Sequence, residues 1–180
     1  MIRLKEKYSN EVLPKLQEEF SIKNKLSVPR LQKVVVSVGL GEAKDTPAVL
    51  DKVKVYLSAL TGQAPMVTHA KKSISTFKLS KGQTIGMMVT LRGDKMYSFF
   101  DKLVTIVLPK VRDFRGVSDR SFDLSGNLNL GFREQAIFPE VDYKTIDRVR
   151  GMAVTIVTSA KDRQRSKKLL ELLGMPFREG

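Results

Sequence analysis

Hydrophobic residues recur with helical spacing at the start of the chain. Between Leu4 and Phe20 an apolar residue returns every four positions, which predicts one helix kinked at Pro14 or two short helices. A β-branched run makes 31–39 a predicted strand. Positions 46–62 then predict a helix, because they begin with a polar cap and a proline, keep apolar residues on one face and end in glycine.

Alternation of apolar and polar residues marks the middle of the chain. Segment 65–77 has an extended pattern, and the apolar residues of 85–91 alternate cleanly, so both segments are predicted strands. Residues 79–82 lie between them and contain turn-forming types. The two strands are therefore expected to form a long hairpin around this loop.

The second half of the chain predicts two helices and three further strands. Residues 94–109 predict a helix that Asp94 caps and Pro109 closes, and residues 159–173 predict a helix that stops at a glycine. Alternating or β-branched runs predict strands at 122–124, 128–132 and 152–158.

Helices and strands mix along the chain without a regular β-α-β period. This order favours an α+β fold, in which a mainly antiparallel sheet has helices packed against it and carries a protruding basic hairpin loop. No stretch is rich enough in Pro, Gly or Ser to act as a linker. Residues 1–180 are therefore expected to form a single domain, and a domain of that length can bury a sizeable core.

The charge balance points to a polyanionic partner. Thirty-two Lys and Arg stand against nineteen Asp and Glu, which leaves a net charge of +13. Nucleic acid is the leading partner class, and a membrane surface is the weaker one. The chain shows neither a long apolar run nor the apolar core of a signal peptide at its start, so a cytoplasmic location is expected.

The residue types also exclude several kinds of chemistry. The chain has no Cys and one His, which removes disulfides, cysteine nucleophiles and thiolate or multi-histidine zinc sites. We therefore expect no metal and no cofactor. The runner-up functions are a small basic enzyme acting on nucleic acid and a membrane-surface protein. The basic helix near the end lacks Trp and a broad apolar face, which argues against the membrane.

One stretch in mid-chain carries positive charge only. From Lys52 to Gly93 there is no Asp or Glu, yet the stretch has seven cations: Lys52, Lys54, Lys71, Lys72, Lys78, Lys81 and Arg92. Ordinary surfaces intersperse both signs, because a field of one sign repels itself unless a counter-charge is bound. Within it, residues 68–78 alternate cations with hydroxyls, which suits phosphate and ribose contacts. A solvated, mobile turn is the alternative.

A second basic cluster opens the last predicted helix. Its members are Lys161, Arg163, Arg165, Lys167 and Lys168, with Asp162 as the only acid among them. Cations at a helix N-terminus oppose the helix dipole, and a bound phosphate would relieve that conflict. Solvated charge on a helix face explains the cluster equally well.

Three features resemble enzyme motifs without matching one. Gly39-Leu40-Gly41 follows a strand, but Lys44 stands where a dinucleotide fingerprint needs its third glycine, so a tight turn open to close approach by another chain fits better. The carboxylate pairs Glu140 with Asp142 and Asp119 with Asp123 flank turns, where acids satisfy backbone donors. His69 has no catalytic partner in a recognised arrangement.

Several blocks of the sequence together resemble one family. Residues 57–73 (LSALTGQAPMVTHAKKS) are similar to the signature of the bacterial large-subunit ribosomal protein five family. Further blocks resemble it in order, across essentially the whole chain: 34–43 (VVVSVGLGEA), 91–93, 108–116 (LPKVRDFRG), 121–123, 130–143 (LGFREQAIFPEVDY) and 151–155.

The resemblance implies a structural protein of the large ribosomal subunit and not an enzyme. Its implied partners are 5S rRNA, 23S rRNA, the P-site tRNA, small-subunit ribosomal protein thirteen and other proteins of the central protuberance. In this view the chain helps to attach 5S rRNA, touches the tRNA and forms an intersubunit bridge. Cations would neutralise phosphates, and polar side chains and glycines would fit one folded RNA.

The resemblance also implies where these contacts lie. The rRNA-binding positions are Lys33, Ser37, Gly39, Gly41, Thr61, Gly62, Gln63, Thr68, His69, Lys71, Lys72, Thr90 and Arg92. The tRNA-contacting positions are Ser73, Ser75, Thr76, Lys78, Ser80, Lys81 and Gly82. The bridge positions are Arg112, Asp113, Arg115, Arg133, Glu134, Glu140, Asp142 and Tyr143.

Four of these positions depart from the family pattern. Ser37 stands where the family typically has Asn, so a hydroxyl replaces an amide contact. His69 replaces a usual Lys or Arg, and Ser80-Lys81 replaces a typical Arg-Glu pair. Individual phosphate contacts are expected to shift accordingly.

Overall fold

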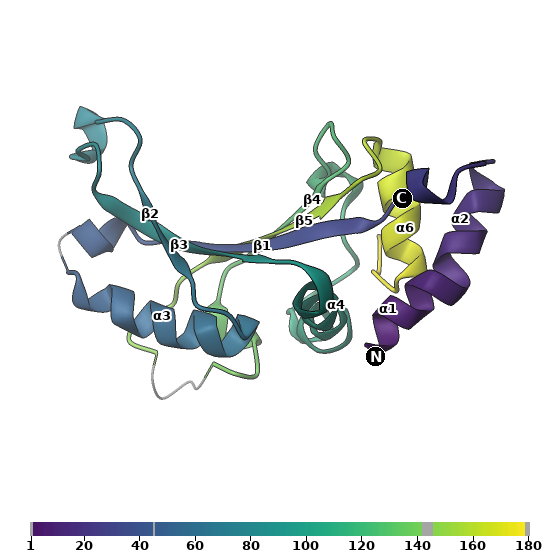
Figure 1. Cartoon of the computed structure of the whole chain (residues 1–180). Coiled ribbons are helices and arrows are strands. Elements are labelled where there is room, and N and C mark those ends of the chain that lie inside the picture. The colour runs from purple at the N-terminus through teal and green to yellow at the C-terminus, as the bar shows by residue number, and fades with distance from the viewer. Residues whose placement is uncertain (1, 45, 142–145, 179–180) are drawn as a thin grey trace. The chain divides into compact units, whose positions relative to one another are not determined.

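The computed structural model describes residues 2–44, 46–141 and 146–178 and has the predicted α+β architecture (Figure 1). Its α-helices are α1 (Arg3–Lys7), α2 (Leu13–Glu19), α3 (Ala48–Thr61), α4 (Gly93–Lys102), α5 (Leu108–Lys110) and α6 (Arg163–Leu172). Its strands are β1 (Leu31–Gly39), β2 (Met66–His69), β3 (Thr84–Leu91), β4 (Leu128–Phe132) and β5 (Met152–Thr158).

The five strands form one antiparallel sheet in the order β2-β3-β1-β5-β4. β2 pairs antiparallel with β3, with Met66 opposite Met88 and Thr68 opposite Gly86. The register shifts after Thr68, at a bulge that ends the regular pairing. The predicted hairpin between these strands and the antiparallel sheet are therefore confirmed.

Contacts along the chain divide it into two compact units, which we describe separately. The first unit comprises Met1–Val34, Leu91–Leu130 and Thr155–Gly180, and the second comprises Val35–Thr90 and Gly131–Val154. The division passes through strands β1, β3, β4 and β5, and the single domain over residues 1–180 stays a prediction.

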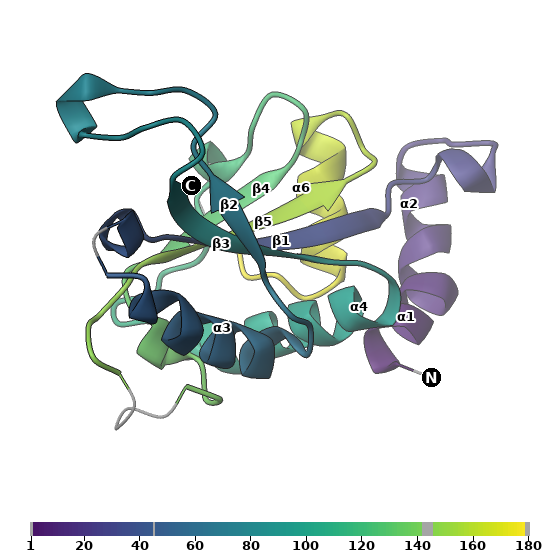
Figure 2. The same ribbon diagram turned by 60° about the vertical axis from the view of Figure 1, so that its left-hand side comes forward.

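The second unit buries one face of its strands under α3 (Figure 2). Val36 and Val38 of β1 and Met87 and Val89 of β3 are buried, as are the inward residues of α3: Val49, Val53, Leu57 and Leu60. α3 begins at Ala48 and ends at Thr61, and the φ of 65° at the following Gly62 suits glycine at a helix C-terminus. The intervening residues of β1, such as Ser37, are only half-buried and line the opposite face.

The first unit packs its helices through Leu4, Leu16, Phe100, Leu103 and Leu169, all of which are buried. Two ion pairs join its early helix to α4. Arg3 lies 2.7 Å from Asp101, and Lys5 lies 2.8 Å from Asp94. No helix among the described residues is both long and apolar enough to cross a membrane.

Two helical stretches, 3–19 and 93–110, each contain a proline near their C-terminal part, and the helix continues beyond it. Residues Tyr8–Val12 and Leu103–Val107 are π-helical, and each segment is followed by a Leu-Pro pair that opens α2 or α5. Proline cannot donate to the carbonyl four residues earlier, and wider π turns accommodate that loss. The helix predicted to close at Pro109 therefore continues to Lys110, and the first helix runs through Pro14 without a break.

Three predicted boundaries are wrong. The hairpin connection covers residues 70–83 and not 79–82. After His69 the two sides are joined by backbone hydrogen bonds of Ala70 with Gly82 and Gln83 and by a bridge between Ile74 and Leu79, and these do not form a regular ladder. Residues 122–124 contribute only a bridge from Phe122 to Leu128. The last helix begins at Arg163, later than predicted, because Asp162 caps it by accepting the Arg165 N–H.

Candidate nucleic-acid interface

The β2–β3 connection in the second unit is held by its own hydrogen bonds. The backbones of Ile74 and Leu79 pair in both directions, at 2.8 and 3.1 Å, below a short helical turn at Ser75–Phe77. Ser73 Oγ accepts the Lys81 N–H at 2.9 Å. The connection is therefore an ordered segment with its hydroxyl and amide groups placed, although the predicted protrusion of the loop remains a prediction.

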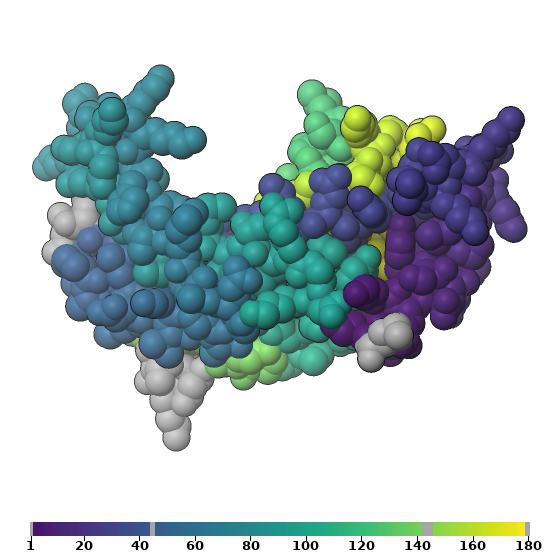
Figure 3. All heavy atoms as spheres, viewed as in Figure 1, coloured from purple at the N-terminus to yellow at the C-terminus, as the bar shows by residue number. Residues whose placement is uncertain are grey.

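The side chains of this connection lie at the surface. Residues 71–78 and 80–82 are exposed, and Figure 3 shows their teal-blue atoms at the surface of the second unit. Lys71, Lys72, Lys78 and Lys81 thus lie on one segment, as the acid-free stretch of sequence predicted. The predicted tRNA-contacting residues belong to the same exposed segment. Phe77 is 67% exposed and adds an aromatic ring to it.

The uncovered face of the sheet in the second unit presents hydroxyl and thioether side chains. Ser37, Thr68 and Thr90 are half-buried on this face. Gly86 lies beneath Thr68, because a Cβ added at Gly86 would be 3.1 Å from the Thr68 Oγ1. Met66 is 64% exposed and lies opposite Met88. Hydroxyls and flexible thioethers on a flat strand surface suit ribose and base edges better than isolated phosphates.

The predicted Thr61-Gly62-Gln63 site divides into buried and accessible parts. Thr61 is buried, and its Oγ1 donates to the Leu57 carbonyl at 2.6 Å. Gln63 Nε2 donates to the Thr90 carbonyl at 3.2 Å, which ties the end of α3 to β3. Gly62 is exposed. Gly62 and Gln63 can meet a partner, whereas the Thr61 hydroxyl is already occupied within the chain.

The remaining predicted rRNA-binding positions lie in both units. His69 is exposed, and its Nδ1 lies 3.5 Å from the Thr84 Oγ1. Gly39 and Gly41 are exposed at the end of β1, with open space where a Cβ would stand. Lys33, on β1, and the exposed Arg92, after β3, belong to the first unit.

The predicted bridge positions are also split between the units. Arg112, Asp113 and Arg115 are exposed in the first unit. Arg133, Glu134 and Glu140 are exposed in the second unit. Asp142 and Tyr143 lie outside the described residues.

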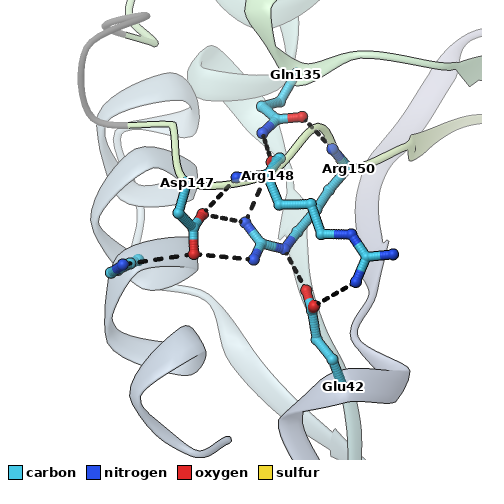
Figure 4. Close-up of polar contacts among 6 residues, drawn as sticks. Glu42, Gln135, Asp147, Arg148 and Arg150 are labelled. Carbon is cyan, nitrogen blue, oxygen red and sulfur yellow. Dashed lines mark hydrogen bonds and ion pairs between the residues drawn. The ribbon is translucent and has the colours of Figure 1, made fainter.

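An ion cluster in the second unit was missed by sequence reasoning (Figure 4). Arg150 is at its centre with a side chain only 6% exposed, and its Nε lies 2.6 Å from the Glu42 Oε1. Its Nη1 and Nη2 lie 2.7 and 3.2 Å from the two Asp147 carboxylate oxygens. Arg148 donates to the other Glu42 oxygen at 2.9 Å, and Lys52 lies 3.4 Å from Asp147. The signal was the Asp-Arg-Val-Arg sequence at 147–150, which alternates cations immediately before a strand.

The cluster shifts the proton affinities of its carboxylates. The hydrogen bond from Arg150 holds the pKa of Asp147 far below its usual value, and the nearby charges of Arg150 and Lys52 act in the same direction. Hydrogen bonds from Arg150 and Arg148 likewise lower the pKa of Glu42. The side chain of Gln135 completes the arrangement, because its Nε2 donates to the Arg148 carbonyl at 2.7 Å and its Oε1 accepts the Arg150 N–H.

Other motifs from the sequence have structural partners. In the last helix, Lys167 pairs with Asp119 at 2.8 Å and Lys168 pairs with Glu19 at 3.1 Å. Two of the five cations of the second basic cluster are therefore paired with acids within the first unit. Asp123 caps a turn by accepting the N–H groups of Ser125 and Asn127. Gly41–Lys44 forms a short 3-10 turn and α3 starts only at Ala48, so the glycines do not open a helix as a dinucleotide fingerprint would.

Comparisons with known proteins agree on one family. The family model described as ribosomal protein L5 matches residues 24–79, and the model for the C-terminus of the same ribosomal family matches residues 84–177. Over 177 residues, which are 98% of this chain, it is 56% identical to the large ribosomal subunit protein uL5 of Carboxydothermus hydrogenoformans and 57% identical to that of Caldanaerobacter subterraneus. The matches cover 99% of each relative. The corresponding protein of Roseiflexus castenholzii is 54% identical, with 98% of both chains covered.

Proposed function

Because the chain belongs to the ribosomal protein L5 family, we propose that it is a structural constituent of the large ribosomal subunit that binds 5S rRNA. The family is a structural one, so the chain is a ribosomal protein and not an enzyme, and its place in the cell is the cytoplasmic large subunit. In this role the chain helps to attach 5S rRNA in the central protuberance.

The observation that carries the proposal is the exposed basic connection between β2 and β3. Its four lysines have no acidic residue among them, and all four are exposed on one segment. Holding like charges together costs free energy that a bound polyanion recovers, and each neutralised phosphate releases counterions. A structured RNA therefore suits this segment better than solvent does.

The uncovered sheet face next to this segment supplies a different kind of contact. Ser37, Thr68 and Thr90 offer hydroxyls, and Gly39 and Gly41 let a backbone approach closely. The 2′-hydroxyls and base edges of a folded RNA are complementary to such a surface. We assign this face, with Gly62, Gln63, His69, Lys71 and Lys72, to 5S rRNA. By the family resemblance, Lys33 and Arg92 of the first unit and the occupied Thr61 are also proposed as rRNA-binding positions.

The remaining contacts are proposed on the family resemblance together with exposure. Ser73, Ser75, Thr76, Lys78, Ser80, Lys81 and Gly82 are assigned to the P-site tRNA, on the segment whose surface exposure is described above. The bridge to small-subunit protein thirteen is assigned to Arg112, Asp113, Arg115, Arg133, Glu134 and Glu140, with Asp142 and Tyr143 as further members. Contacts to 23S rRNA and to other central-protuberance proteins complete the proposal.

The test is binding of purified protein to a 5S rRNA transcript over a range of salt concentrations. We expect log affinity to fall with log salt with a slope of magnitude about 3.5 or more, which corresponds to five or more phosphate contacts. The double variant Lys71→Glu, Lys72→Glu should bind more weakly, while its circular dichroism spectrum and thermal midpoint stay close to those of the wild type.

Two controls make the result specific. An unrelated folded RNA of similar length, which is not a transfer RNA, measures non-specific affinity, and the RNA recovered after incubation should be intact. Affinity for 5S rRNA that is independent of salt, or no greater than that for the control RNA, would contradict the proposal. Unchanged binding by the double variant would remove Lys71 and Lys72 from the site.

A further inference from the structure

The ion cluster of the second unit has one more cationic side chain than it has carboxylates. Arg148, Arg150 and Lys52 stand against the carboxylates of Glu42 and Asp147, so the five charges sum to one positive charge. Ionised carboxylates are secured by the lowered pKa values of both acids. A surplus positive charge is thus built into the arrangement.

Arg150 cannot deliver that charge to a partner. Its side chain is 6% exposed, and its Nε, Nη1 and Nη2 all donate to Glu42, Asp147 or the Arg148 carbonyl. Its role is to hold the loop that contains Asp147 and Arg148 against the turn that contains Glu42. It is a positioning residue for whatever lies at that junction.

Arg148 is free to act outward. Its side chain is 70% exposed, and its Nη1 donates to Glu42; Figure 4 shows the other guanidinium nitrogens pointing away from the cluster. Glu42 fixes one edge of the planar group, so the other edge has a defined direction. The N–H groups on that edge match the geometry of two phosphate oxygens. On binding, this side chain would lose less conformational entropy than a mobile lysine side chain would.

The space beside Arg148 is a hollow of about 330 Å³. It is lined by Gly39, Gly41, Glu42, Val149, Gly151 and the two arginines. Gly39 and Gly41 leave open space where other residues would have a Cβ. A backbone phosphate can therefore come close to the turn without meeting a side chain. Both Glu42 oxygens are engaged by arginine, which limits their repulsion of an anion.

From this geometry we propose that the hollow binds one RNA phosphodiester, with the Arg148 guanidinium as its ligand and the Gly39–Gly41 turn as its floor. The inference deepens the proposed function, because the RNA is the one bound by the sheet face that Gly39 and Gly41 border. Sequence reasoning included these glycines but not Arg148.

The test compares Arg148→Gln with Lys52→Gln in the full chain, using the 5S rRNA transcript. Both changes remove one cation from the same cluster. Lys52 is 57% exposed and pairs with Asp147, but it does not line the hollow. We expect Arg148→Gln to weaken binding about tenfold and to reduce the magnitude of the salt slope by about 0.7 to 0.9, because one phosphate contact is lost. Lys52→Gln should leave both quantities near their wild-type values.

The outcomes separate this inference from the function it rests on. If wild-type protein does not bind 5S rRNA, the proposed function fails. If wild-type protein binds and the two variants give equal affinities and slopes, the Arg148 site is wrong while the function stands. Reduced affinity with an unchanged slope would also overturn it, since the lost contact would not be to a phosphate. Thermal unfolding of both variants checks that each remains folded.

Discussion

Replacing Arg150 with methionine should destabilise the protein much more than any exposed charge change. Methionine keeps an unbranched side chain of similar reach but removes the donors that Glu42 and Asp147 use. Breaking a buried ion pair by deleting one partner costs about 3–5 kcal/mol. The carboxylate side chains are 29% and 31% exposed, so water can partly replace the arginine. We therefore expect a loss at the lower end, about 3 kcal/mol.

The assay is urea unfolding of the RNA-free protein followed by far-ultraviolet circular dichroism, with thermal unfolding alongside. For a chain of this length, about 3 kcal/mol corresponds to a midpoint lower by roughly 6–12 °C. The matched control is Arg148→Met, which removes the same charge from the same acid at 70% exposure and should cost less than about 1 kcal/mol. Equal losses in the two variants would refute the reasoning, because burial of Arg150 would then have no energetic consequence.

Three further expectations can be measured. Acid titration should separate wild type from Arg150→Met. The pKa of Asp147 is lower in the folded chain than its value near 4 in the unfolded chain, so this group contributes stability above about pH 4 that is lost as the pH falls. The unfolding free energy of the wild type should therefore drop more steeply below about pH 4 than that of the variant. Gly86→Ala should lower the thermal midpoint, because the new Cβ would lie 2.5 Å from the Val38 carbonyl oxygen. Gly39→Ala adds a Cβ in open space, so it should keep the wild-type midpoint and weaken RNA binding. Thr158→Val should lower the free energy of unfolding in urea by about 1–3 kcal/mol, because the buried Ser166 hydroxyl, 2.6 Å from the Thr158 hydroxyl, would lose that partner. A decrease below about 0.5 kcal/mol would contradict this expectation.

The sequence pattern predicted correctly those helices and strands that depend on residues close together in the sequence. The strand at Leu31–Gly39 follows from a β-branched run, and α3 follows from its apolar face and from the glycine that ends it. The acid-free stretch likewise predicted an exposed basic segment, because charge of one sign over many residues cannot be buried. These features depend on neighbours in sequence, which a single chain displays.

The errors arose where the outcome depends on wider turns or on distant residues. The helix predicted to close at Pro109 ends at the next residue, Lys110, but the π turn that precedes the proline was not predicted. The ion cluster was missed because Glu42 and Arg150 are 108 positions apart. No periodicity within the sequence brings two such residues together, so only the folded chain shows that Arg150 is buried and Arg148 is not.

The first unit is assembled from three separate stretches, and its final stretch starts at Thr155. During synthesis at about 5–20 residues per second, the apolar face of the first helices therefore waits roughly 8–30 s for β5 and α6 to emerge. Over that interval Leu4, Val12 and Leu16 have no complete core to enter, although each is buried in the finished fold. A chaperone that shields nascent apolar helices would consequently matter more for the yield of this chain than for one whose units are continuous in sequence.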